Sequence, residues 1–268
     1  MERIFLYCLG YASESTGVEV HGWILMSNHY HVVVTDVEGR GPEFYQKLNQ
    51  NVACLLKRYL GLPEEVWSKA QTSVTDLSNE EHPSEEAVLE RLVYTLGNAQ
   101  LSGLVRRWWH WEGAQSTPED LGRRELRVGR PGCASRRSKL PSEVRLRVTV
   151  PPSLSHWDRG ALVSELRERL RRLPEPAKPV GRARLRSQGV WERPRGVPKR
   201  SRGPRVGGSA SRRRAMRGVL EAFAEAYERA LSKYRAGEPA VFPRGTWKMV
   251  RLFHVPVEGG ADPPAAAA

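Results

Sequence analysis

The spacing of apolar residues predicts three amphipathic helices in the first part of the chain. Apolar side chains recur at helical intervals over residues 2–16, 42–60 and 84–101, which is the pattern of a helix with one buried face. Gly17 and Gly61 follow the first two stretches, at the position where glycine commonly ends a helix. Short stretches with a high β propensity lie between these helices, at residues 18–26, 29–35 and 72–77. This mixture predicts an α+β domain over residues 1–116.

The rest of the chain has a weaker pattern. Residues 117–140 are polar and rich in Gly and Arg, and we expect them to form a linker. Residues 141–268 are interpreted as a basic C-terminal extension, with a strand at 143–150 and helices at 158–173 and 211–235. Pro, Gly and Arg dominate residues 174–211, where almost no apolar periodicity remains, so we expect a partly disordered arm.

Two histidines stand at the start of the second strand of an expected β-hairpin. Successive side chains of a strand point to opposite faces, so His29 and His31 share one face and Tyr30 takes the other. Two neighbouring imidazoles on a strand can bind one divalent metal ion. The alternative is an ordinary strand whose histidines alternate outward. His21, on the first strand of the hairpin, is expected to be structural.

The third expected helix carries Tyr94 and Asn98, which lie one turn apart on the same face. A tyrosine in such a helix commonly buries its ring and hydrogen-bonds its hydroxyl, and the periodicity alone favours that interpretation. Gly97 falls inside the same helix and is expected to weaken it by about 1 kcal/mol relative to alanine.

The net charge of +13 is distributed unevenly along the chain. Residues 1–117 contain 9 Lys and Arg against 15 Asp and Glu, whereas residues 118–268 contain 34 against 15. A strongly basic half indicates a polyanionic partner, most simply nucleic acid. An arginine-rich composition with no binding role is the competing explanation.

Basic residues beside tryptophans give a second indication of nucleic acid. Residues 106–111 read RRWWHW, and guanidinium groups next to indoles suit phosphate contacts and base stacking on single strands. At least one of these tryptophans is expected to pack in the core instead. The candidate DNA-binding residues are Arg106, Arg107, Trp108, Trp109, Lys199, Arg200, Arg202, Arg212, Arg213 and Arg214.

The composition also bears on location. No apolar run approaches the roughly 20 residues of a membrane-spanning helix, so we expect no membrane partner. The N-terminus has no signal-peptide pattern, and the three cysteines are scattered. Scattered, odd-numbered cysteines fit reduced thiols, and we expect a cytoplasmic protein.

Two blocks of sequence carry a resemblance to a known family. They are HGWILMSNHYHVVV at residues 21–34 and YTLGNAQLSGLV at residues 94–105. With the expected order of helices and strands, they resemble the single-tyrosine transposases of the His-hydrophobic-His class. The similarity is greatest to the transposases associated with repetitive extragenic palindromes, and it covers about residues 2–116.

The resemblance implies a fold and a chemistry. The fold is a ferredoxin-like antiparallel sheet with helices on one face. Mg²⁺ or Mn²⁺ is implied on His29 and His31, with Asn98 as a polar third ligand or support. The hydroxyl of Tyr94 is implied to attack single-stranded DNA that contains a hairpin, which leaves a 5′-phosphotyrosine and a free 3′-hydroxyl. A homodimer is implied as the assembly.

Several alternatives stay open at this point. The family normally has a strand before its first helix, so this strand lies upstream of Met1, or another segment replaces it, or the protein is a decayed copy. A decayed copy would be a DNA-binding protein without turnover. A metal hydrolase with a water nucleophile would cleave DNA without a covalent adduct. Tyr45 and Tyr59 are the alternative nucleophiles.

Overall fold

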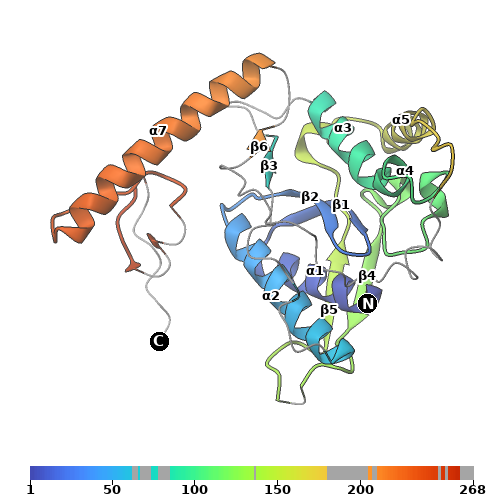
Figure 1. The fold of residues 1–268 in the computed structure, drawn as a ribbon, viewed down its shortest axis with the longest axis horizontal. Helices are drawn as coiled ribbons and strands as arrows, with labels where there is room; N and C mark the ends of the chain where they lie inside the picture. The colour runs from blue at the N-terminus through green and yellow to red at the C-terminus, as the bar shows by residue number, and fades with distance from the viewer. Residues whose placement is uncertain are drawn as a thin grey trace. The chain divides into compact units, whose positions relative to one another are not determined.

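A computed structural model describes residues 1–61, 66, 74–77, 85–135, 137–179, 205–206, 210–246, 249–250 and 253–259. The chain divides into two compact units, Met1–Pro204 and Arg205–Ala268. The predicted α+β class is confirmed, because the first unit combines helices with two small antiparallel sheets (Figure 1). Within the described ranges, no helix has the length and apolar character needed to cross a membrane.

The first unit opens with four elements close to their predicted positions: α1 (Glu2–Thr16), β1 (Glu19–Leu25), β2 (Tyr30–Thr35) and α2 (Gly41–Leu60). Gly17 ends α1 in the left-handed conformation (φ 71°), and its N–H donates to the carbonyl of Ser13. Strands β1 and β2 pair antiparallel, with Leu25 opposite Tyr30 beside the turn. The predicted hairpin is therefore confirmed.

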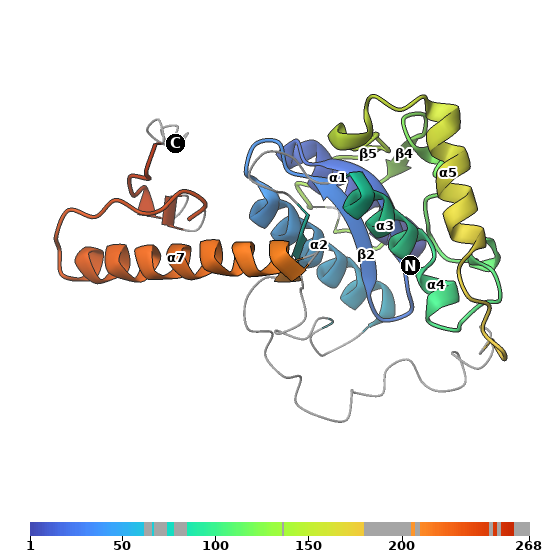
Figure 2. The same cartoon turned by 90° about the horizontal axis from the view of Figure 1, so that it is seen from above.

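Helices cover both faces of this hairpin, which corrects the expectation of helices on one face. The Tyr30 ring lies 5.3 Å from the ring of Phe5 in α1, and its hydroxyl donates to Asn49 in α2 at 2.6 Å. On the opposite face, Gly22 lies against Leu92 of a third helix, α3 (Glu85–Leu96). Figure 2 shows α3 and α2 on opposite sides of the hairpin. Side chains that alternate along β2 therefore pack against helices on two opposite faces of the hairpin.

The third predicted helix is interrupted by a glycine. Helix α3 (Glu85–Leu96) ends before Gly97, and α4 (Asn98–Leu101) adds a single short turn. A later helix, α5 (Arg159–Arg171), packs against α3 and is held there by a bidentate ion pair from Arg169 to Glu86. Helix α3 is thus fixed between the hairpin and α5.

The interruption at Gly97 allows this close packing. A Cβ at this position would overlap the side chain of Leu173, just beyond α5, and would lie 3.3 Å from Leu170 Cδ2. It would also lie 2.9 Å from the carbonyl oxygen of Val93. The glycine that looks like a weak helix position in the sequence is therefore required by a contact from residues more than 70 positions later.

In Gly97→Ala we expect overpacking to cost about 1–3 kcal/mol. The better helix propensity of alanine offsets roughly 1 kcal/mol of that cost, so the free energy of unfolding should fall by up to about 2 kcal/mol. Urea denaturation of the two proteins measures the difference. Gly132→Ala is the control, because a Cβ there meets nothing within 4 Å. A Gly97→Ala protein as stable as the parent would contradict the packing argument.

The stretch expected to be a linker contains a strand instead. Strand β4 (Glu125–Gly129) pairs antiparallel with β5 (Glu143–Arg147). This second hairpin packs on α1, where a Cβ on Gly10 would lie 3.0 Å from Val144 Cγ2. The domain expected to end at residue 116 therefore continues through α5, and the linker over residues 117–140 is corrected. Charged side chains alternate with Leu and Val along β4, which is why its composition resembles a polar linker.

Residues from later in the chain cover the edge of β1 that does not pair with β2. Val20 forms a parallel bridge with Val148, and the N–H of Thr149 donates to the Val20 carbonyl at 2.9 Å. At the other end of the strand, the N–H of Leu25 donates to the Ala114 carbonyl at 2.8 Å. This edge is satisfied without an additional strand before α1.

His21 occupies the β-bulge of β1, where the register shifts between Val20 and Gly22. Its Nε2 lies 2.7 Å from Thr35 Oγ1 and its Nδ1 lies 3.0 Å from the Thr149 carbonyl. The side chain is buried, and burial lowers its pKa to about 4 because the charged ring would lose its hydration. His21 is therefore a structural residue, as expected.

The low pKa of His21 predicts acid sensitivity. Between pH 6.5 and pH 4 the unfolded chain binds a proton on this ring and the folded chain does not. Stability should therefore fall as the pH drops through this range, by up to about 1.4 kcal/mol per pH unit for this one group. Chemical denaturation at several pH values measures the slope. His21→Gln should reduce the slope of unfolding free energy against pH. His156→Gln, at an exposed histidine, is the control and should leave the slope unchanged. If His21→Gln has the same slope as the parent protein, His21 is not the group responsible.

The remaining elements are short or belong to the second unit. Of the strand predicted at residues 72–77, β3 (Thr75–Asp76) is seen, and residues 71–73 lie outside the described residues. The second unit contains β6 (Arg205–Val206) and α7 (Ala210–Arg235), which confirms the predicted helix. Its own small core consists of Ala230, Phe242, Met249 and Val255. Residues 180–204 of the expected arm lie outside the described residues.

Candidate functional site

The two hairpin histidines lie side by side on one face, as the alternation along the strand predicts. The ring centroids of His29 and His31 are 5.0 Å apart, with the planes at 87°. The turn is closed by a hydrogen bond from the Met26 N–H to the His29 carbonyl at 2.8 Å. The Nδ1 of His29 lies 2.7 Å from Asn28 Oδ1. Because that oxygen can only accept, Nδ1 carries the proton and Nε2 keeps a free lone pair.

Tyr94 lies beside this pair, although it comes from α3. Its ring centroid is 5.5 Å from that of His31, with the planes at 89°. The side chain is 40% exposed, between the buried residues Val93 and Thr95. No hydrogen bond to its hydroxyl is found within the described part of the chain. The interpretation of Tyr94 as a buried, hydrogen-bonded core tyrosine is therefore wrong.

Arg91 completes the cluster and is a residue that the sequence analysis missed. It lies three residues before Tyr94 on α3, and its Cζ is 5.3 Å from the centre of the Tyr94 ring. The i, i+3 spacing places both side chains on one helix face. In the sequence, the signal for Arg91 is its position three residues before Tyr94 on the same predicted helix.

Both histidines of the pair favour the neutral form. The pKa of His31 is lowered to about 4, first by burial and then by the neighbouring charges of His29 and Arg91. The pKa of His29 is also lowered, because neighbouring groups displace part of the water around its otherwise exposed ring. A neutral imidazole keeps the lone pair that a metal ligand needs.

His29 and His31 fit a site in which a divalent ion has only a few protein ligands. Two neutral imidazoles suit Mn²⁺ better than Mg²⁺, which prefers oxygen. The hydrogen bond between His29 Nδ1 and Asn28 Oδ1 would hold the orientation of the ring, as hydrogen bonds to metal-binding histidines commonly do. The described residues hold no group of three or more His, Cys, Asp or Glu that could bind a metal. Within the described ranges, the other ligands of an ion on His29 and His31 would therefore be amide, water or substrate oxygens.

Asn98 is buried at the start of α4, and no hydrogen bond joins it to either histidine in the described part of the chain. Its Oδ1 accepts a hydrogen bond from the Ser102 hydroxyl at 3.3 Å. The next residue, Ala99, packs with Met26 of the hairpin turn in a small apolar cluster. Gly97 interrupts the helix between Tyr94 and Asn98, and Asn98 is buried whereas Tyr94 is exposed. Its role as a third ligand stays a prediction.

The two alternative tyrosines lie elsewhere. Tyr45 packs on Phe44 in α2, and its pKa is raised by burial. Tyr59 is exposed near the end of α2. Neither makes a ring contact with His29 or His31, so in the described chain Tyr94 is the tyrosine that the fold brings to the pair.

The Arg-Trp segment is divided between the core and the surface. Trp108 is buried, so its ring cannot stack on a base, which corrects its place among the DNA-binding candidates. Trp109 is 49% exposed, with the guanidinium of Arg107 5.8 Å from its ring centre. Arg107 also forms an ion pair with Glu175, and Arg106 is exposed. For Arg106, Arg107 and Trp109, DNA binding stays a prediction.

The other basic candidates are described only in part. Lys199, Arg200 and Arg202 lie outside the described residues. Arg212 and Arg213 belong to α7, but their side chains are not among those described. Arg214 is exposed on the same helix. Their contact with DNA also stays a prediction.

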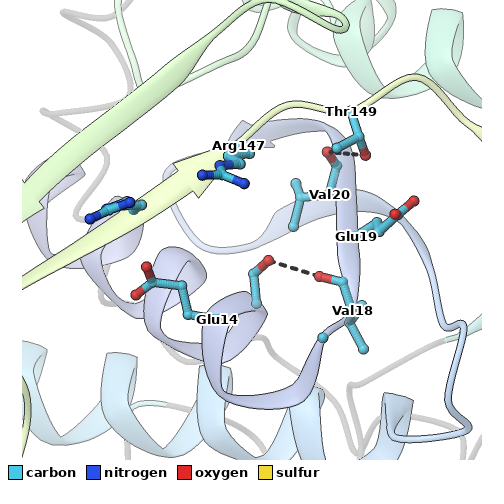
Figure 3. A pocket seen from close by; sticks show the side chains of 9 residues that line it. Glu14, Val18, Glu19, Val20, Arg147 and Thr149 are labelled. Atoms are coloured by element: carbon cyan, nitrogen blue, oxygen red, sulfur yellow. Dashed lines mark hydrogen bonds between the residues drawn. The ribbon is translucent and has the colours of Figure 1, made fainter.

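A pocket at another place in the first unit contains none of the predicted site residues. It lies between the end of α1, the start of β1 and β5, where Figure 3 shows Glu14, Arg147 and Thr149 around it. Arg147 is engaged there, because its Nε donates to Glu125 at 2.6 Å. This pocket therefore adds no residue to the candidate cluster of His29, His31, Tyr94 and Arg91.

Comparison with known proteins adds no relative to this picture. The resemblance to the transposases rests on the two sequence blocks, and the functional argument rests on the contacts among His29, His31, Tyr94 and Arg91. No family model, curated protein or solved structure matches this chain.

Proposed function

We propose that this protein is a metal-dependent transposase that cleaves and rejoins single-stranded DNA through a 5′-phosphotyrosine. The observation that carries the proposal is the contact between Tyr94 and His31, with His29 beside it. His31 lies on β2 and His29 immediately before it, whereas Tyr94 lies on α3, far later in the sequence. Tyr94 is exposed, its hydroxyl has no hydrogen-bond partner among the described residues, and two imidazoles that favour the neutral form lie beside it. This setting supports nucleophilic chemistry more than packing.

The proposed reaction is a transfer between oxygens. The Oη of Tyr94 attacks the phosphorus, and the bond from phosphorus to the 3′ oxygen breaks. The phenol loses its proton to solvent, and the departing 3′ oxygen takes up a proton to become a hydroxyl. Attack of a 3′-hydroxyl on the phosphotyrosine reverses the reaction and rejoins a strand, since the covalent intermediate preserves the bond energy.

His29 and His31 would hold the metal ion in this scheme. A bound ion would withdraw charge from the phosphate oxygens and so favour attack. Because both imidazoles are neutral, they would not cancel the charge of the ion. The exposed setting of His29 and Tyr94 leaves room for a polynucleotide.

The finer features of the family belong to the same proposal. The order of α1, β1, β2 and α2 supports part of a ferredoxin-like arrangement, here with helices on both faces of the hairpin. Hairpin-containing DNA as substrate, Mg²⁺ or Mn²⁺ as cofactor and a homodimer as assembly are the family properties we propose with it.

A second candidate is a DNA-binding protein that has lost turnover. The observation that favours it is the charge distribution, since residues 118–268 carry 34 Lys and Arg against 15 Asp and Glu. Such a protein would need the basic half but not the cluster around Tyr94.

The test combines purified full-length protein, Mn²⁺ and end-labelled single-stranded hairpin DNA on a denaturing gel. We expect a slowly migrating band, the covalent adduct, that disappears on proteolysis. Cleaved DNA without an adduct would indicate a water nucleophile. Binding without cleavage would indicate the DNA-binding protein.

A further inference from the structure

Arg91 has a position that the proposed function does not yet use. It shares a face of α3 with Tyr94, and its guanidinium lies 5.3 Å from the centre of the tyrosine ring. The Tyr94 ring also contacts His31, with the ring centroids 5.5 Å apart. Arg91 therefore places a fixed positive charge beside the candidate nucleophile, in the cluster that contains the histidine pair.

No described residue neutralises this guanidinium. Its Nε is buried and has no hydrogen-bond partner, and no carboxylate pairs with Arg91 in the described part of the chain. Arg169, which faces the same helix, shows the contrast, because it is paired with both Glu86 and Glu165. A partly buried cation without a counter-charge is costly, so an anion at this position would be stabilised.

We propose that Arg91 is a phosphate-binding residue that contacts a non-bridging oxygen of the scissile phosphate beside Tyr94. The inference rests on the proposed function and names the group that would hold the substrate phosphate. The planar guanidinium matches two phosphate oxygens at once, which a lysine cannot do. Arg91 and an ion on the histidine pair would then stabilise the phosphate from two different elements, α3 and β2. The competing explanation is that Arg91 only packs on the Tyr94 ring.

The first measurement is the rate of adduct formation in Arg91→Gln and Arg91→Lys. We expect Arg91→Gln to slow the reaction about 100-fold, as the loss of one preorganised charge contact does. Arg91→Lys should recover only part of the rate because it loses the bidentate geometry. Arg123→Gln is the matched control, since Arg123 is an exposed arginine of the same unit, and it should keep the parent rate. A Mn²⁺ titration followed by electron paramagnetic resonance checks that the histidine pair is intact in each variant.

The second measurement separates this inference from the proposed function. Single-stranded DNA binding is compared in a Tyr94→Phe background, which cannot form the adduct and retains the ring. Arg91→Gln should weaken binding about tenfold, equivalent to the loss of one charged contact, while Arg123→Gln should not.

The outcomes divide clearly. If the parent protein forms the adduct and Arg91→Gln changes neither rate nor affinity, the inference is overturned and the proposed function stands. If no adduct forms but Arg91→Gln alone weakens binding, the proposed function fails and the phosphate site stands. Equal losses in Arg91→Gln and Arg123→Gln would mean that only overall charge matters, which also overturns the inference.

Discussion

Tyr94→Phe is expected to abolish the covalent protein–DNA adduct while leaving DNA binding intact. The substitution removes the attacking oxygen but keeps the ring that contacts His31 and Arg91. Removal of a catalytic nucleophile can cost on the order of 10⁶-fold in rate. Because the hydroxyl is exposed and takes part in no hydrogen bond within the described residues, stability should change little. The denaturing gel measures the adduct, and filter binding measures affinity.

Tyr59→Phe is the matched control for this experiment. Tyr59 is also exposed and also lies on a helix, but it has no ring contact with the histidine pair. It should retain full activity. If Tyr94→Phe still forms the adduct, Tyr94 is not the nucleophile, and loss of the adduct in Tyr59→Phe would identify the correct residue. If Tyr94→Phe cleaves DNA at the parent rate and no variant forms an adduct, water is the nucleophile.

The sequence predicts the parts of this site that depend on local geometry. The shared face of His29 and His31 follows from strand alternation alone, and the rings lie 5.0 Å apart as a result. The turn between β1 and β2 and the helix that carries Tyr94 are also local features. Tyr94 was singled out only through the resemblance, because helical periodicity cannot distinguish a core tyrosine from an exposed one.

Features that depend on distant contacts could not be read from the sequence. Gly97 looks like a defect in a helix until Leu173 is placed against it. The linker at 117–140 looks polar until β4 is seen to pair with β5 and to pack on α1. Trp108 and Trp109 are consecutive tryptophans, and only the tertiary structure shows which ring is buried and which is exposed. In each case the deciding partner comes from elsewhere in the fold.

The histidine pair gives the second large expected effect. His29→Ala and His31→Ala should each lower Mn²⁺ affinity by more than the 10-fold to 100-fold typical of losing an outer-shell contact, because each removes a direct ligand. Adduct formation should fall in parallel, and excess Mn²⁺ should restore part of it. Mn²⁺ titration by electron paramagnetic resonance measures the affinity. His110→Ala, at an exposed histidine in the Arg-Trp segment, is the control and should bind Mn²⁺ normally.

The two histidine variants differ in what they can prove. His31 touches the Tyr94 ring, so His31→Ala removes a possible ligand and a packing contact together. His29 contacts His31 and Asn28 but makes no ring contact with Tyr94. A loss of Mn²⁺ binding and adduct formation in His29→Ala therefore reports the metal role by itself. If His29→Ala keeps both while His31→Ala loses the adduct, the pair is not a metal site, and His31 acts by positioning Tyr94.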